Sequence, residues 1–125
     1  MSACPCGSGR MFEQCCGRYH AGEPAPDAEA LMRSRYSAYV LGLEDYLRAT
    51  WYPATCPVSL DLHTPPLPQW RGLEVKTHMA QDATHATVEF VARYKLNGRA
   101  FRLHETSRFQ QVEGRWLYVD GIQHE

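Results

Sequence analysis

Three short turns divide residues 70–125 into four stretches in which apolar residues recur at every second position. The turns are Asp82-Ala83, Asn97-Gly98 and Glu113-Gly114, and Asn-Gly is the strongest two-residue signal for a hairpin. Alternation with a period of two is typical of strands that bury one face. The sequence therefore predicts a four-stranded antiparallel meander with one apolar face.

The turns also predict which residues face each other across the strands, because a two-residue loop fixes the register. Counting outward from the loops gives these pairs: Met79 with Ala86, Phe90 with Glu105, Phe109 with Tyr118, Ser107 with Asp120, Glu105 with Ile122. This register places Glu105, Ser107 and Asp120 on the apolar inner face. We also expect His78 and His85 to pair across the first hairpin on the outer face, and we interpret them as surface residues because no third metal ligand converges on them.

A helical hairpin precedes the strands. Asp27 is a favourable helix N-cap, the apolar residues that follow recur at three- and four-residue spacing, and Gly42 ends this helix. A second short helix is expected over Leu43–Trp51. Arg35 falls inside the apolar stripe of the first helix. We expect the hairpin to cover the concave face of a curved sheet, which gives an α+β cone with a central pocket.

The pocket would hold two carboxylates, and unpaired buried charges are costly. We therefore expect Arg35 to pair with Glu105, Asp120 or both. In one alternative this ion-pair network is closed and only docks the helix on the sheet. In the other alternative the pocket is open. It then binds a small molecule, or it is the active site of a small enzyme with Glu105 or Asp120 as general base. The candidate pocket residues are Arg35, Tyr36, Tyr39, Glu105, Ser107, Phe109, Trp116, Tyr118 and Asp120.

Four of the five cysteines lie within residues 4–16, in the pattern Cys-x-Cys followed by Cys-Cys: Cys4, Cys6, Cys15 and Cys16. Four thiolates form a closed tetrahedral shell around Zn²⁺, which is a structural and not a catalytic geometry. The alternative is a pair of disulfides. The first residues lack the basic and apolar segments of an export signal, so we expect a reducing cytoplasm and one zinc ion. His20 is the alternative to Cys16 as fourth ligand.

Two stretches of the sequence resemble known families. Cys4-Pro5-Cys6-Gly7-Ser8-Gly9 with Cys15-Cys16-Gly17 is similar to the SEC-C zinc motif, which implies a zinc knuckle that contacts proteins or nucleic acid. The segments Met32–Tyr36, Glu105–Phe109 and Tyr118–Gly121 resemble the bacterial YchJ-like family. That resemblance implies a nuclear-transport-factor-2-like, or cystatin-like, fold and implies no reaction. With the glycine and prolines of residues 21–26 read as a linker, the chain divides into a knuckle (1–20), a linker (21–26) and an α+β domain (27–125).

Charge and hydropathy limit the partners. The formal net charge is −1, whereas nucleic-acid-binding domains usually have a basic surface and a high pI. No apolar run reaches the roughly 18 residues that span a bilayer. We therefore expect a zinc-binding interaction module with a protein partner at the knuckle and a small ligand in the pocket, and no membrane contact. An RNA- or ribosome-associated factor, using Arg93 and Arg102 on the outer face, is the less favoured alternative.

Overall fold

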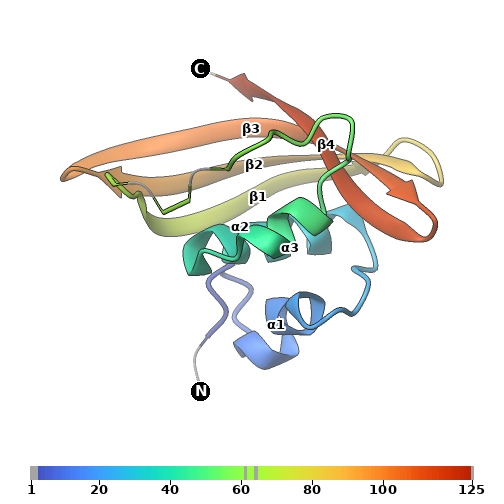
Figure 1. Cartoon of the computed structure of the whole chain (residues 1–125), viewed down its shortest axis with the longest axis horizontal. Coiled ribbons are helices and arrows are strands. Elements are labelled where there is room, and N and C mark those ends of the chain that lie inside the picture. Colours follow the sequence, from blue (N-terminus) through green and yellow to red (C-terminus); the bar gives the residue numbers. More distant parts are fainter. Residues whose placement is uncertain (1–2, 61, 64, 125) are drawn as a thin grey trace.

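The computed structural model of the chain describes residues 3–60, 62–63 and 65–124. Four strands form one antiparallel sheet in the order β1-β2-β3-β4, with all helices on one side of it (Figure 1). The predicted α+β meander is confirmed. In chain order the elements are η1 (Phe12–Gln14), α1 (Cys16–His20), α2 (Ala28–Leu41), α3 (Glu44–Ala49), β1 (Gln69–Ala80), β2 (His85–Leu96), β3 (Arg99–Val112) and β4 (Arg115–His124).

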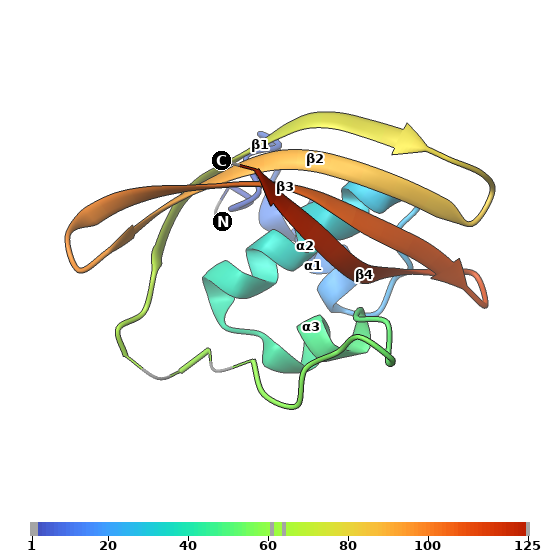
Figure 2. The same ribbon diagram turned by 90° about the horizontal axis from the view of Figure 1, so that it is seen from above.

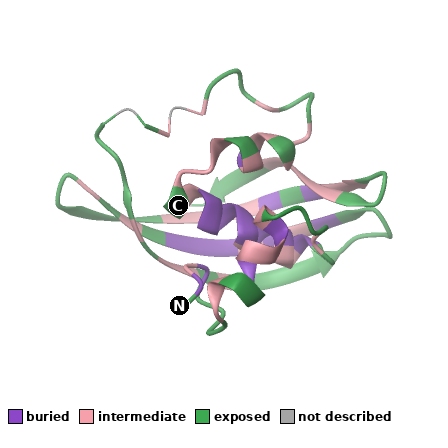
Figure 3. Ribbon diagram, turned by 60° about the horizontal axis from the view of Figure 1, so that its bottom comes forward, coloured by how far each residue is buried: buried purple, intermediate pink, exposed green. Residues whose placement is uncertain are grey.

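Helix α2 lies between the sheet and the N-terminal segment. The long strands curve and twist over α2, and β4 crosses above α2 and α3 (Figure 2). On the other side of α2 lie η1 and α1 (Figure 1). The buried residues concentrate on α2 and the middle of the sheet (Figure 3). The core thus forms a layer between α2 and the concave face of the sheet.

Helix α2 begins and ends where its sequence signals predict. The Asp27 Oδ1 atom accepts a hydrogen bond of 2.8 Å from the Ala30 amide, which satisfies one free N–H group of the first turn. Gly42 follows the last helical residue with a φ of 72°, a left-handed conformation that costs glycine little. The expected hairpin is completed by α3, which is shorter than the predicted Leu43–Trp51.

The register between β2 and β3 is the predicted one, including Phe90 opposite Glu105. The predicted register at the first hairpin is wrong by one residue. Its loop is longer than predicted, because the amides of Gln81 and Asp82 both donate to the His85 carbonyl. Met79 consequently lies opposite Thr87 and is 63% exposed. A bulge between Val75 and Thr77 restores the predicted pair of Val75 with Phe90.

The register between β3 and β4 shifts by one residue at a bulge opposite Arg108 and Phe109. Phe109 lies opposite Tyr118 as predicted, but the next pair is Arg108 with Asp120, so Val119 has no partner. The predicted pairs Ser107–Asp120 and Glu105–Ile122 are therefore wrong. A bulge adds one residue to one strand, so every β4 side chain beyond Val119 lies on the face opposite to the predicted one. Ile122, expected inside, is 65% exposed.

The segment after α3 extends the sheet at its β4 edge. Trp51 forms a parallel bridge with Tyr118, the Tyr52 amide donates to the Tyr118 carbonyl at 2.7 Å, and the Tyr118 amide donates to the Thr50 carbonyl at 2.8 Å. These bonds satisfy part of an exposed strand edge and hold the end of α3 against β4. Within the described residues, no helix has the length and apolar content that crossing a bilayer requires.

The N-cap of α2 allows a first test. Asp27→Ala removes the side-chain oxygen that caps this helix, and we expect the free energy of unfolding to fall by about 1 kcal/mol. Urea denaturation followed by far-UV circular dichroism measures the change. Asp27→Ser is the matched control, because a serine hydroxyl also accepts from the first turn and should retain most of the stability. Equal loss in both variants would contradict a capping role.

Candidate metal centre and adjacent pocket

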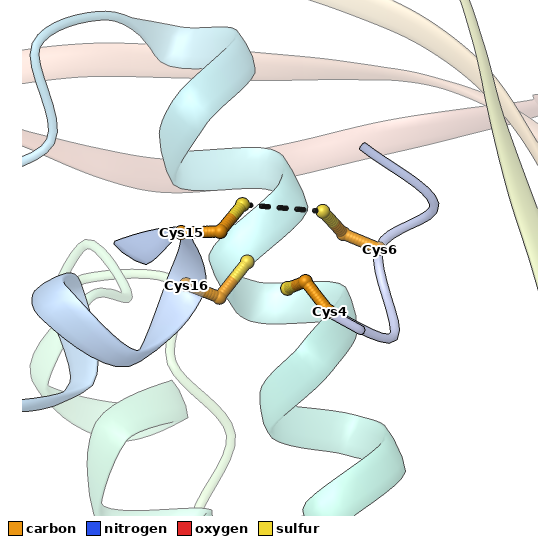
Figure 4. Close-up of side chains that lie close together, drawn as sticks. All are labelled: Cys4, Cys6, Cys15 and Cys16. Atoms are coloured by element: carbon orange, nitrogen blue, oxygen red, sulfur yellow. Dashed lines mark hydrogen bonds between the residues drawn. The ribbon is translucent and has the colours of Figure 1, made fainter. Parts of the chain in front are cut away.

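Two tight backbone turns bring the four N-terminal cysteines together. Cys4 and Cys6 lie on a loop that is closed by a bridge between Ala3 and Met11 and by the Cys4 amide, which donates to the Arg10 carbonyl at 2.9 Å. Cys15 and Cys16 lie at the junction of η1 and α1. All four sulfur atoms point toward one another (Figure 4). All four side chains are buried, with at most 7% exposure.

The spacing of the sulfur atoms fits a single metal ion. The four sulfurs all lie within 4.8 Å of one another, and those of Cys6 and Cys15 are 3.7 Å apart. Tetrahedral zinc with Zn–S bonds of about 2.3 Å requires sulfurs about 3.8 Å apart. All five cysteines are free thiols, and 3.7 Å is far longer than a disulfide bond of about 2.0 Å. Four buried sulfurs at this spacing can bind a soft divalent metal ion.

Neighbouring groups already favour a thiolate in the cluster. Hydrogen bonding from Cys16, together with Ser8 and Cys4, lowers the pKa of the Cys6 thiol to about 4. The same bond to Cys6 and burial raise the pKa of Cys16. The Ser8 hydroxyl also lies 3.2 Å from the Cys15 sulfur. The thiols of the cluster thus differ in how readily they lose a proton. A binding metal ion would displace the remaining thiol protons, because only thiolates act as ligands.

The cluster is anchored directly on α2. The Cys4 sulfur lies 3.6 Å from the Ser37 hydroxyl, and Arg33 Nη1 donates to the Cys6 carbonyl at 3.0 Å. His20 Nε2 lies 2.8 Å from the Ser34 carbonyl. His20 therefore binds α2 and is not among the side chains that converge on the cluster. The knuckle packs as part of the domain core, because its four cysteines belong to the same buried cluster as residues of α2.

A cavity of about 270 Å³ separates α2 from the concave face of the sheet. Seven of the predicted pocket residues line it: Arg35, Tyr36, Tyr39, Glu105, Ser107, Phe109 and Tyr118. Phe90 also lines the cavity, as its predicted place opposite Glu105 implies. Further lining residues were not predicted, namely Met32, Trp70, Ala92 and Leu103. Their inward positions follow from the same alternation and helical spacing that identified the others. The wall is mostly apolar and aromatic, as in typical small-molecule sites.

Two predicted members lie outside this cavity. Asp120 follows the β4 bulge onto the outer face, where its carboxylate accepts two hydrogen bonds of 2.6 and 2.5 Å from Arg108. This pairing lowers the pKa of Asp120. Trp116 packs against the core and lines a different cavity, between α1, α3 and β4. Both residues are therefore removed from the candidate pocket.

Arg35 is buried, and no carboxylate among the described residues pairs with it, contrary to the expected ion pair. Its guanidinium carbon lies 4.8 Å from the ring centre of Trp51 and 4.7 Å from that of Tyr118. Its Nη1 donates to the Leu47 carbonyl at 2.9 Å and to the Thr50 hydroxyl at 2.7 Å. Burial lowers the pKa of Arg35. Cation–π contacts and neutral acceptors stabilise this charge.

Glu105 lies in the cavity and is bound by hydroxyl groups. Its Oε2 accepts hydrogen bonds from the Ser107 hydroxyl at 2.6 Å and from the Tyr118 hydroxyl at 3.4 Å. The carboxylate packs over Gly121, where an added Cβ would collide with Oε2. Glycine at this position therefore leaves the space that the carboxylate occupies. Burial and the nearby Glu105 charge raise the pKa of Tyr118, which keeps its hydroxyl protonated as a donor.

Helices on one face of a curved antiparallel sheet, with a pocket between them, define a nuclear-transport-factor-2-like domain, here combined with a SEC-C cysteine cluster. The model of the SEC-C motif matches residues 2–18, and the model described as "YchJ, middle NTF2-like domain" matches residues 27–121. The chain belongs to the YchJ family, as its sequence resemblance predicts.

Relatives and solved structures agree with this assignment. The chain is 61% identical to a UPF0225 protein of Cupriavidus metallidurans, over 94% of this chain and 86% of that one. It is 56% identical to a UPF0225 protein of Chromobacterium violaceum, over 97% and 93% of the two chains. The solution structure of a SEC-C motif containing protein from Rhodopseudomonas palustris superposes with a TM-score of 0.87 at 32% identity, covering 98% of both chains.

The Arg35 stack allows a second test. Arg35→Met removes two hydrogen bonds and both cation–π contacts, and we expect a loss of about 1–3 kcal/mol in the free energy of unfolding. Chemical denaturation measures the loss. Arg35→Lys keeps the charge but not the planar group, and should recover only part of the stability. Full recovery by lysine would show that the charge alone matters and would contradict the stacking interpretation.

Proposed function

We propose that this protein binds one structural Zn²⁺ through Cys4, Cys6, Cys15 and Cys16. The observation that carries this proposal is the convergence of four buried sulfur atoms within 4.8 Å of one another. An all-sulfur donor set is typical of structural zinc and leaves no open position for a substrate. The ion would join the N-terminal loop to α1. Because these cysteines belong to the same buried cluster as Ala28 and Met32, the ion would also stabilise the core beneath α2.

We further propose that the pocket binds a small, largely planar apolar molecule that carries a hydrogen-bond donor. Aromatic and aliphatic side chains supply most of its wall, and Glu105 is the acceptor within it. Ser107 and Tyr118 contact only Oε2 of Glu105, so Oε1 can accept from a ligand. Binding is favoured over catalysis because Asp120 is outside and Arg35 is held by Leu47, Thr50 and two rings.

A protein partner at the knuckle stays a prediction. The turn Ser8–Arg10 is exposed, whereas Cys4, Cys6 and His20 bind α2. One side of the knuckle is thus used within the domain and the opposite side is available to a partner. This division of surfaces supports a contact role for the exposed turn.

The zinc proposal predicts one zinc ion per chain, measured by elemental analysis after purification without added metal. In the Cys4→Ser/Cys15→Ser variant we expect zinc to be lost and the melting temperature to fall, because two of four ligands are gone. Cys56→Ser is the matched control, since Cys56 lies outside the cluster, and it should retain full zinc content. A wild-type protein that contains no metal and two disulfides would overturn the proposal.

The pocket proposal predicts that N-phenylnaphthylamine, an apolar fluorescent amine, binds and becomes brighter. Leu103→Trp enlarges a lining side chain and should weaken this binding by roughly tenfold, about 1.4 kcal/mol. Val112→Trp adds the same side chain at an exposed position of the same strand and should leave binding unchanged. A closed pocket would give no saturable fluorescence in the wild type, and the proposal would then be wrong even if zinc is present.

A further inference from the structure

Three potential metal ligands converge on the face of the sheet that points away from the helices. They are Glu89 of β2, His104 of β3 and His124 of β4. Phe90 and Leu103 line the inner pocket, so their neighbours Glu89 and His104 lie on the outer face. One ligand atom from each of the three side chains lies within 4.8 Å of the other two.

The register explains why these residues meet. His104 lies directly opposite His124, and Glu89 lies opposite Thr106, two residues along the same face from His104. Without the bulge at Val119, His124 would point to the inner face. The histidine pair of the outer face is therefore His104–His124, whereas the predicted pair of His78 with His85 is wrong, since His78 lies opposite Val88.

The local contacts hold these groups in a defined arrangement. His104 Nε2 lies 2.6 Å from Glu89 Oε2, and this bond lowers the pKa of Glu89. The two imidazole ring centres are 4.6 Å apart. The Thr106 hydroxyl lies 2.7 Å from His124 Nε2 and orients that ring. His104 is only 21% exposed, so its ring is already restricted.

The surrounding charges leave Glu89 available to a cation. Lys76 pairs with Glu74 at 3.4 Å, and Arg108 pairs with Asp120 at 2.5 Å. Among the described residues, the ion-pair partner of Glu89 is His104 alone. A metal ion would take the place of the hydrogen bond between Glu89 and His104, and small rotations of the exposed His124 would complete the ligand set.

We propose that Glu89, His104 and His124 form a second metal site, separate from the cysteine cluster, that binds a divalent transition-metal ion such as Zn²⁺, Ni²⁺ or Co²⁺. Two imidazoles and one carboxylate favour these borderline ions over Mg²⁺ or Ca²⁺, which prefer ligand sets made of oxygen. Three protein ligands also differ from the closed four-sulfur shell, because they leave coordination positions to water. The second site is thus exchangeable, whereas the first is structural.

The experiment titrates the zinc-loaded protein with Ni²⁺ in an isothermal calorimeter. Ni²⁺ binds imidazole well, and measuring the zinc content after the titration shows whether the cysteine cluster kept its ion. We expect one saturable Ni²⁺ equivalent per chain with no loss of zinc. In His104→Gln/His124→Gln the affinity should fall by at least roughly tenfold, and Glu89→Gln should weaken binding in the same direction.

His85→Gln is the matched control. His85 also contacts a carboxylate, with Nδ1 3.0 Å from Asp82 Oδ1, but the described residues place no third ligand beside it. Its removal should leave Ni²⁺ binding unchanged. Wild-type protein that takes up no Ni²⁺, or uptake that survives in His104→Gln/His124→Gln, would overturn the proposal. Thermal melting followed by circular dichroism verifies that each variant is folded.

Discussion

The burial of helix α2 from two opposite sides is the constraint on which the rest of the structure depends. Helices α1 and α3 and strands β1, β2 and β4 all contact it. The side of α2 that faces the knuckle carries Ser34 and Ser37, both fully buried. Small polar side chains let the knuckle approach closely, and both residues bind it, Ser34 through its carbonyl and Ser37 through its hydroxyl. The other side of α2 forms one wall of the pocket. The cysteine cluster and the pocket therefore lie on opposite sides of a single shared helix.

Much of this arrangement could be predicted from the sequence because it depends on local signals. The Asn97-Gly98 turn has both residues at positive φ, as a type I′ hairpin requires, and it fixes the register of β2 with β3. The cap at Asp27 and the break at Gly42 depend on their own backbone geometry in the same way. The cysteine spacing is equally local. These features do not depend on what the rest of the chain does.

The features that could not be predicted depend on contacts between distant segments. The partners of Arg35 include Trp51, which lies in an irregular segment that bridges to Tyr118 of the sheet. Apolar periodicity in the helix indicates that Arg35 is buried, and a buried charge needs partners. A carboxylate, a carbonyl and an aromatic ring can each be such a partner. The sequence therefore predicted correctly that the charge needs partners and predicted the wrong ones. The role of Gly121 could not be predicted either, since it follows from the position of the Glu105 carboxylate.

The bulge at Val119 decides the chemistry of both faces of the sheet. Alternation along a strand has a period of two, so one inserted residue exchanges the faces of all that follow. In β4 the exchange moves Asp120 outward to Arg108 and brings Gly121 opposite Ser107. The pocket consequently keeps one carboxylate, Glu105, instead of two. The same exchange places His124 beside His104 on the outer face. A regular β4 would have given an acidic pocket and an outer face with only two of the three ligands, so this single irregularity separates the apolar pocket from the polar cluster on the other side.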